Sequence, residues 1–439
     1  MDSTERKYVT RWTIPFFTIW GGQAVSLLGS QLVQFSLIWW LTETTGSATV
    51  LAMATMIGLL PQVFIGPIAG ALVDRWSRRA IMILADGLVA LATLALATVF
   101  WMDIIQIWHI YFALFIRAAS GGFHWAAMQA STSLMVPKEH FSRIQGINQV
   151  LNGALNIGSA PLAALLLGLM PMQGILAIDV STALLAIIPL CFIPIPQPEN
   201  IVQDSTCSRN TTVWGDLWAG FRYVWSWPGL LILMITAMLI NLVITPAFSL
   251  IPILVNKHFN GGAMHLAWLE AAAGIGIVSG GLLLSAWGGF RRRIMTTLTG
   301  LVFLGIGLVL LGLLSTSAFN TAIIITFLIG FAVALVDGPL LAVVQAVVSP
   351  EMQGRIFTLI LSAAKAMTPI GLAFAGPIAD TFGVQSWYIA GGLTTICLGF
   401  GAFFIASVTH IEGGFQKKSD NNSQLSARDI KETAEASCD

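Results

Sequence analysis

Charged residues are scarce in this sequence. Asp, Glu, Lys and Arg make up 10% of its 439 residues, against about 25% in an ordinary soluble domain. Hydrophobic residues reach 56%, and the mean hydropathy is +0.82. A soluble fold could not hide this much apolar surface, because even a large domain leaves about a quarter of its unfolded surface in water. The composition therefore predicts a protein that faces lipid. The formal net charge of zero gives no indication of a nucleic-acid partner.

Motifs for covalent and metal chemistry are also missing. The four cysteines are scattered and form no CxxC pair, which argues against a disulfide framework and against a zinc site; they are Cys191, Cys207, Cys397 and Cys438. No GxxxxGK[ST] sequence occurs, so ATP hydrolysis by that route is excluded. There is no soluble domain for Ser-His-Asp or metal chemistry. We predict a protein that is not an enzyme and that has no cofactor and no metal site.

Long apolar runs are what the sequence has in abundance. A helix that spans a bilayer needs about 20 apolar residues, and polar, charged or Gly/Pro-rich breaks divide the chain into twelve such runs. The first is too long for a signal-peptide core and is interpreted as a retained span. The predicted fold class is an all-α membrane protein with twelve transmembrane helices in two pseudo-symmetric six-helix bundles. The expected divisions are an N-terminus (1–13), a first bundle (14–195), a linker (196–228), a second bundle (229–408) and a disordered tail (409–439).

The distribution of basic residues predicts the orientation. If both termini are cytoplasmic, 18 of the 21 Lys and Arg lie on the inner side, all but Arg117, Lys257 and Lys365, as the positive-inside rule requires. We therefore expect a cytoplasmic N-terminus, linker and tail. Within the linker, residues 213–227 carry four aromatic side chains on one helical face, which predicts an amphipathic helix at the membrane surface.

The two halves of the chain resemble each other at an offset of about 215 residues, a transporter pattern in which the binding site lies between two repeats. Arg78-Arg79 corresponds to Arg292-Arg293, and Ala160-Pro161 corresponds to Gly376-Pro377. Each match is weak alone, but the common order and spacing indicate a duplicated six-helix unit.

Between the second and third apolar runs the chain reads GALVDRWSRR over residues 70–79. This segment resembles the GxxxDRxxRR signature of the major facilitator superfamily. A charged latch between the halves is the expected role of its residues, with close helix approach at the glycine; they are Gly70, Asp74, Arg75, Arg78 and Arg79. The alternative interpretation is a loop whose positive charges only set the orientation of the chain in the membrane. The corresponding cluster in the second half, residues 291–293, has no acidic residue.

Two further segments are similar to elements of the same superfamily. Residues 117–121 (RAASG) resemble its RxxxG element, which implies a role for Arg117 in proton coupling, with an interhelical structural bond as the alternative. Residues 158–164 (GSAPLAA) resemble the antiporter element GxxGPxxGG, with alanine in place of glycine. Small residues and prolines in these elements are expected to pack helices closely; the set is Gly121, Gly158, Pro161, Gly376 and Pro377.

The start of the chain carries the most specific resemblance. Residues 17–27 (FTIWGGQAVSL), 41–48 (LTETTGSA) and 373–380 (AFAGPIAD) are similar to bacterial macrolide-efflux exporters of the drug:proton antiporter group. The resemblance implies the superfamily fold, proton-driven export of small hydrophobic substrates, and a place in the bacterial inner membrane; we also expect a monomer. Two alternatives remain open. One is an exporter of a siderophore, lipid or secondary metabolite, and the other is a non-transporting membrane receptor or scaffold.

Polar side chains inside the apolar runs are costly in lipid and predict the transport pathway. Two sets are expected to line a substrate cavity, namely Gln23, Gln31 and Gln34 on the first run and Asn148, Asn152 and Asn156 on the fifth. Hydrogen bonds between helices are the alternative role for the asparagines. A proton-coupled exporter also needs a carboxylate that exchanges protons in a desolvated site. The candidates are Asp337 and Glu270, with Arg117 and Lys365 as charge partners. For Asp86 and Asp179 structural pairing is expected.

Overall fold

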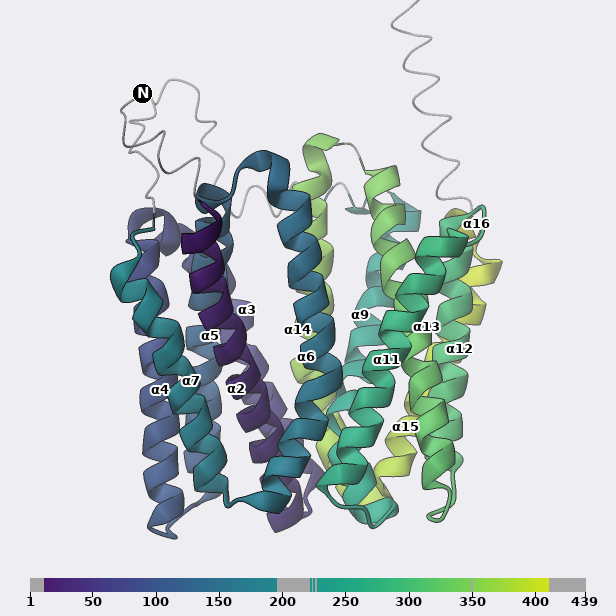
Figure 1. Ribbon diagram of the computed structural model, residues 1–439. Helices are drawn as coiled ribbons and strands as arrows, with labels where there is room; N and C mark the ends of the chain where they lie inside the picture. Colours follow the sequence, from purple (N-terminus) through teal and green to yellow (C-terminus); the bar gives the residue numbers. More distant parts are fainter. Residues whose placement is uncertain (1–11, 196–221, 223, 226, 349, 410–439) are drawn as a thin grey trace, which may run out of the picture.

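The structure is a computed structural model that describes residues 12–195, 222, 224, 225, 227–348 and 350–409. Within those residues every regular element is a helix (Figure 1). The first bundle is built from six long helices, which are α2 (Thr13–Thr45), α3 (Ala48–Arg75), α4 (Arg78–Trp101), α5 (Ile107–Met135), α6 (Phe141–Leu169) and α7 (Met172–Phe192). A short 3₁₀ turn, Lys138–His140, precedes α6.

The second bundle repeats this arrangement with one interruption. Its helices are α9 (Pro228–Ser249), α10 (Ile251–Ile253), a π-helical turn (Leu254–His258), α11 (Ala263–Trp287), α12 (Arg293–Leu313), α13 (Phe319–Val347), α14 (Pro350–Phe382), α15 (Val384–Phe404) and the short α16 (Ala406–Thr409). The sequence predicts one span over 229–255, whereas the structure breaks it at Leu250. Pro246 and Pro252 flank the break and lack the N–H that a continuous helix needs.

Helices dominate because a bilayer offers no partner for free backbone N–H and C=O groups. Ten helices of the described chain are long and apolar enough to cross a membrane, and α3 contributes a shorter apolar stretch, Ala48–Pro61. Helix α5 is as long but carries Arg117 and His124. Large apolar side chains on the outer faces are exposed, among them Trp101, Phe192 and Phe404, as expected of a lipid-facing surface. The predicted fold class, twelve helices in two bundles, is confirmed.

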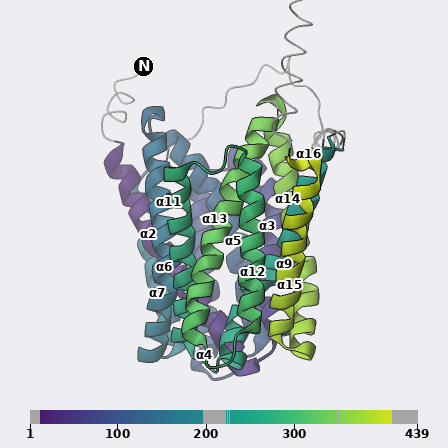
Figure 2. The same ribbon diagram turned by 90° about the vertical axis from the view of Figure 1, so that its right-hand side faces the viewer.

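The described ends of the chain, Trp12 and Thr409, lie on the same side of the molecule, at the top of Figure 1. We call this the terminal side and the opposite one the distal side. Figure 2 shows the whole molecule turned by 90° about the vertical axis. Most of the predicted linker helix, 213–227, lies outside the described residues. The bundles meet where α3 packs on α14 and α6 packs on α11.

Small residues allow helices to approach closely within the second bundle. A Cβ on Gly276 of α11 would lie 2.1 Å from the carbonyl oxygen of Phe327 on α13, and one on Gly330 of α13 would lie 2.2 Å from that of Ala273. A side chain cannot be accommodated at such distances, so both positions require glycine. Transmembrane helices associate through this kind of packing, since lipid supplies no hydrophobic drive between them.

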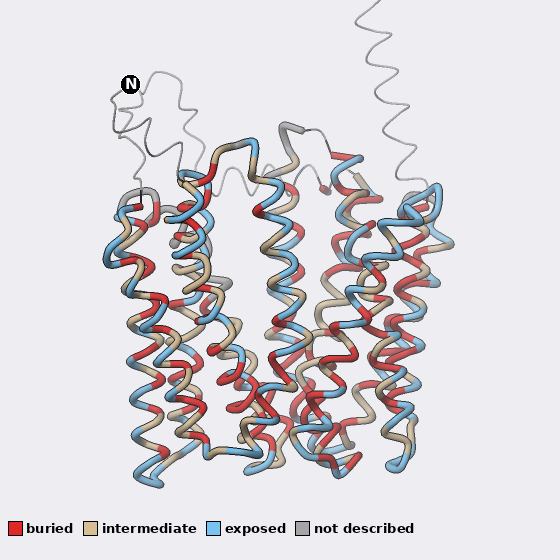
Figure 3. The backbone as a smooth tube through the Cα atoms, in the orientation of Figure 1, coloured by how far each residue is buried: buried red, intermediate tan, exposed pale blue. Residues whose placement is uncertain are grey.

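The hydrophobic core is shared by both bundles on the distal side only. One cluster there joins buried residues of the first bundle, such as Leu41 and Leu51, to residues of the second, such as Leu250 and Leu266. On the terminal side of the described chain the first bundle has two clusters and the second bundle has one, and none of the three joins the two bundles. Figure 3 shows buried residues gathered at the lower end, where the halves meet. The described chain is therefore sealed on the distal side and divided on the terminal side.

Candidate transport cavity

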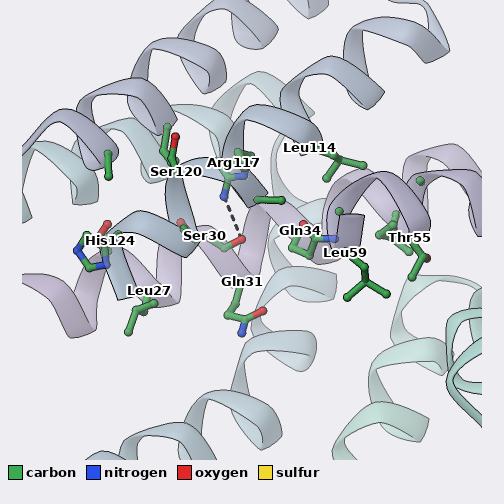
Figure 4. A pocket seen from close by; sticks show the side chains of 18 of the residues that line it. Leu27, Ser30, Gln31, Gln34, Thr55, Leu59, Leu114, Arg117, Ser120 and His124 are labelled. Carbon is green, nitrogen blue, oxygen red and sulfur yellow. Dashed lines mark hydrogen bonds between the residues drawn. The ribbon is translucent and has the colours of Figure 1, made fainter. Parts of the chain in front are cut away.

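A cavity of about 500 Å³ lies between the two bundles. Helices α2, α3, α4, α5 and α7 of the first bundle supply most of its lining, and the second bundle supplies Phe248, Ser249, Pro252 and Glu270. Figure 4 shows Leu27 and Gln31 of α2 and Leu59 of α3 pointing to the same side, away from their own helices. The lining includes both apolar and amide side chains. The volume is in the range that encloses drug-sized molecules.

Arg117 of α5 is held by a network of hydrogen bonds in the first bundle. Its Nη1 lies 2.5 Å from Oδ2 of Asp179 on α7 and 2.6 Å from Oγ1 of Thr93 on α4, and Nη2 donates to the carbonyl of Ser30 on α2 at 3.2 Å. Asp179 also accepts hydrogen bonds from the hydroxyls of Thr93 at 3.0 Å and Ser30 at 3.1 Å. Four helices are thereby joined, and each charge in the pair is balanced.

A second ionisable pair lies closer to the terminal side and is more loosely held. Asp86 of α4 accepts a hydrogen bond from Nε2 of Gln23 at 2.9 Å through Oδ2. Its Oδ1 faces Nε2 of His124 on α5 at 3.5 Å, and this nitrogen is buried without a hydrogen-bond partner. All three residues line the cavity. The pair is therefore in contact with the transport pathway, whereas Asp179 does not line it.

The second bundle contributes one carboxylate to the cavity, Glu270 of α11. It has no hydrogen-bond or ion-pair partner among the residues that the structure describes. At the distal end of the cavity the hydroxyls of Thr55 and Ser249 are 2.8 Å apart and join α3 to α9. This hydrogen bond crosses between the bundles and links them at that end of the cavity.

The two sets of predicted cavity residues have different positions. Gln23, Gln31 and Gln34 all line the cavity. The asparagines of α6 are not part of its lining. Asn148 accepts a hydrogen bond from Nε1 of Trp20 at 2.8 Å, which matches the alternative role of linking helices. Asn152 and Asn156 are exposed on α6, the helix that packs against α11.

Of the predicted coupling residues, the structure brings Arg117 and Glu270 to the cavity. Asp337 and Lys365 are exposed and do not line it. The ion pairs found in the described part of the chain join Arg117 to Asp179 and His124 to Asp86. Asp337, expected as a coupling carboxylate, and Lys365, expected as a charge partner, therefore form no ion pair within the described residues. Structural pairing of Asp179, expected from the sequence, is what the structure shows.

The latch residues are described in part. Gly70, Asp74 and Arg75 belong to the stretch of α3 whose side chains lie outside the description. Arg78 is buried, and its Nη1 donates to the carbonyl of Ala130 on α5 at 2.7 Å. Arg79 donates to the carbonyl of Cys191 on α7. Both arginines thus bind within the first bundle, and the latch between halves stays a prediction.

The predicted packing residues also divide. A Cβ on Gly376 of α14 would lie 2.7 Å from Cα of Thr49 on α3, so Gly376 lies at a close contact between the bundles. Gly121 and Gly158 have open space, with nothing within 4 Å of a built Cβ. Close packing is therefore not their role in this conformation, and Gly121 instead lines the cavity. Pro161 and Pro377 lie inside α6 and α14.

Sequence reasoning missed the hydroxyl and imidazole partners of the buried charges. Ser30, Thr93 and His124 were not assigned to any site, although each contacts an intramembrane carboxylate. A signal was present, because Ser26, Ser30 and Gln34 lie four residues apart and so share a face of α2 with Gln23. A polar stripe on the first helix indicates a partner inside the bundle.

Two bundles with a cavity between them, ionisable groups at membrane depth and one closed side define the class of secondary transporters. The sequence profile described as Major Facilitator Superfamily matches residues 19–372. The chain belongs to the Major Facilitator Superfamily and is a multi-pass membrane transporter rather than an enzyme.

Relatives and solved structures agree with this assignment. The chain is 36% identical to macrolide efflux protein A of Streptococcus pyogenes over 388 residues, covering 88% of this chain and 95% of the relative. It is 34% identical to macrolide efflux protein A of Enterococcus faecalis over 328 residues, which is 74% of this chain and all of the relative. The crystal structure of the nucleoside transporter NupG matches with a TM-score of 0.68 at 13% identity, covering 90% of this chain and 100% of that chain.

Proposed function

We propose that the protein is a proton-driven exporter of hydrophobic drug-like molecules, macrolides among them, that works by alternating access. The observation that carries the proposal is the cavity shared by both bundles, in which amide and apolar side chains accompany Glu270, a carboxylate with no ion-pair partner among the described residues. The relatives named macrolide efflux proteins support the substrate class, since they align with most of the chain.

The terminal side is proposed to face the cytoplasm of a bacterial cell, with both termini inside. The support is the distribution of Lys and Arg, which the positive-inside rule places at the cytoplasmic loops. In this orientation the shared core of the distal side closes the outer end, and the separate clusters leave the inner end divided. The conformation described is then the one that takes up substrate from inside. A monomer suffices, because one chain supplies both bundles.

The charges of the cavity favour neutral or cationic substrates over anionic ones. Arg117 lines the cavity, but Asp179 balances its charge at 2.5 Å. Glu270 and Asp86 are the acidic residues of the lining, and Lys365 lies elsewhere. Export of an anionic siderophore or lipid would require an unpaired cation in the described lining, so these alternatives are less well supported. Both carboxylates line the cavity, so protons from water can reach them.

Drug tolerance of a pump-deficient bacterium tests the proposal. Cells that express the chain should grow at higher concentrations of erythromycin than cells with an empty vector. An uncoupler, which removes the proton gradient, should abolish export of the drug from these cells. Glu270→Gln should reduce the protection at equal membrane expression. A well-expressed chain that protects against no macrolide and no other hydrophobic antibiotic would contradict the proposed function, and protection unaffected by the uncoupler would contradict the proton drive alone.

A further inference from the structure

We propose that the Asp86–His124 pair of the first bundle carries the coupling proton, whereas Glu270 of the second bundle faces the substrate. This inference rests on the proposed proton-driven export and assigns its proton to named atoms. Neither member of the pair is assigned a transport role by the sequence motifs.

The geometry of the pair leaves room for one proton. Oδ1 of Asp86 and Nε2 of His124 are 3.5 Å apart, and neither atom makes a hydrogen bond within the described chain. A charge-assisted N–H···O bond is about 2.7–2.9 Å long. Binding one proton from cavity water lets Nε2 donate to Oδ1 and draws the two groups together. Release of the same proton to water restores the gap, so the cycle is balanced.

The neighbouring Arg117–Asp179 pair does not offer this freedom. Both oxygens of Asp179 accept hydrogen bonds, and Arg117 contacts Thr93 and Ser30 in addition to Asp179. Adding a proton to Asp179 would break bonds that already exist, whereas adding one to the Asp86–His124 pair makes a bond that is absent. The Arg117 pair is therefore the fixed anchor of the first bundle.

The charged residues around the pair lie on three helices, α5, α7 and α11. Helix α5 supplies Arg117, and helix α7 supplies Asp179, which is near enough to interact electrostatically with Asp86. Helix α2 contributes the uncharged Gln23, and α11 contributes Glu270 across the cavity. Asp179 and Arg117 balance each other, so the proton on the Asp86–His124 pair is the change that alters the charge of the first bundle.

A route from this proton to the movement of the bundles is present in the packing. His124 and Arg117 are seven residues apart, two turns, and so lie on the same side of α5. With Arg117 anchored to α7, closure of the gap at His124 tilts the terminal half of α5 toward α4. Helix α5 also packs along α3, and α3 forms the contact with α14 between the bundles. Protonation can thereby bias the two conformations differently, as coupling requires.

Vesicle transport by the full-length protein separates proton coupling from substrate binding. Two measurements with radiolabelled erythromycin are needed: accumulation driven by a pH gradient, and exchange of labelled for unlabelled drug at equal pH on both sides. For each proton exchanged per drug molecule, a gradient of one pH unit supports about tenfold accumulation. Exchange requires alternating access and drug binding but no net movement of protons.

The variants Asp86→Asn and His124→Gln keep the size and polarity of the side chains. We expect each to lose gradient-driven accumulation while exchange, which needs no net movement of protons, stays measurable. Asp86→Glu should recover part of the accumulation. Asp103→Asn, the same chemical change in an exposed distal loop, is the matched control and should retain both activities. Glu270→Gln should lower exchange and accumulation together.

Each other outcome has a distinct meaning. Folded Asp86→Asn and His124→Gln proteins that accumulate drug as the wild type does would overturn the assignment of the proton. Loss of exchange along with accumulation in these variants would show that the pair binds the drug instead, which also overturns it. A wild-type protein that exchanges erythromycin but ignores the pH gradient would refute the proton drive, and the inference with it. If one variant fails to fold, the other decides.

Discussion

The carboxylate of Asp380 caps the first turn of α3 at Ala48, although the two residues belong to different bundles. Oδ1 accepts the backbone N–H of Ala48 at 2.7 Å, and Oδ2 accepts the N–H of Thr49 and the hydroxyl of Ser47, each at 2.9 Å. The first N–H groups of a helix have no partner within the helix, and its N-terminus attracts negative charge. Asp380 on α14 therefore joins the bundles on the distal side.

Removal of this cap should favour opening on the distal side. Asp380→Ala deletes three hydrogen bonds that exist only when α14 lies against α3. Loss of a helix cap costs about 0.5–2 kcal/mol, and a change of 1–2 kcal/mol shifts a two-state ratio by a factor of about 5–30. Spin labels on Asp103→Cys and Ser317→Cys, in exposed distal loops of the two bundles, should report a larger population of long distances.

The control for the cap is Glu43→Gln, which removes an exposed carboxylate at the distal end of α2. This variant should leave the distance distribution unchanged. If Asp380→Ala and Glu43→Gln gave the same distribution as the unmodified chain, the contact between Asp380 and α3 would not hold the distal side closed.

Gly376→Val should block distal closure by another route. A Cβ at this position would lie 2.7 Å from Cα of Thr49 and 3.2 Å from Cβ of Ala52 on α3, so the helices must separate. We expect gradient-driven drug export to be lost while the protein still folds, since the contact lies between the two bundles and not inside either of them. Gly158→Ala, at a site with open space, should keep full export because alanine favours a helix by about 1 kcal/mol over glycine. Equal export by both variants would contradict this role for Gly376.

The depth of charged residues could be predicted from the sequence, but their partners were not. Helices α5 and α7 both begin on the distal side, and Arg117 and Asp179 lie ten and seven residues into them. At 1.5 Å per residue these are depths of about 15 and 10 Å. Opposite charges at similar depth in one bundle should attract, so this pair was within reach of sequence reasoning.

Contacts between the bundles were beyond that reach. Asp380 binds residues more than 330 positions away, and its place at the end of a span indicates no more than a charge near the membrane surface. The asparagines of α6 show a similar limit. Their spacing predicts one face, but the rotation of α6 decides whether that face lines the cavity, and Asn148 contacts Trp20 of α2 instead. Pro246 and Pro252, in contrast, mark the break after α9 in the sequence itself.

The Arg117–Asp179 pair should be more important for stability than either charge alone. Asp179→Asn leaves the buried guanidinium of Arg117 without its counter-ion, and breaking a buried pair costs about 3–5 kcal/mol. We expect a clear fall in the melting temperature of the purified protein. The double variant Arg117→Gln with Asp179→Asn removes both charges and should recover most of the loss. Thr93→Val removes one hydroxyl and should cost about 1 kcal/mol. A double variant no more stable than Asp179→Asn would contradict the pairing.

Substrate recognition should depend on the glutamines of α2 and not on the asparagines of α6. Gln31 and Gln34 line the cavity, whereas Asn152 is exposed on α6 outside its lining. Replacing an amide that hydrogen-bonds a bound drug loses about 0.5–1.5 kcal/mol, so Gln31→Leu and Gln34→Leu should each weaken erythromycin binding by a few-fold, and the pair together by more. Asn152→Leu, the matched change of an amide on α6, should leave the dissociation constant unchanged.

Tryptophan-quenching or scintillation-proximity titration of the purified proteins measures these constants. Weaker binding by Asn152→Leu, with normal binding by both glutamine variants, would move the binding site toward α6 and α11 and away from the cavity described between α2 and Glu270.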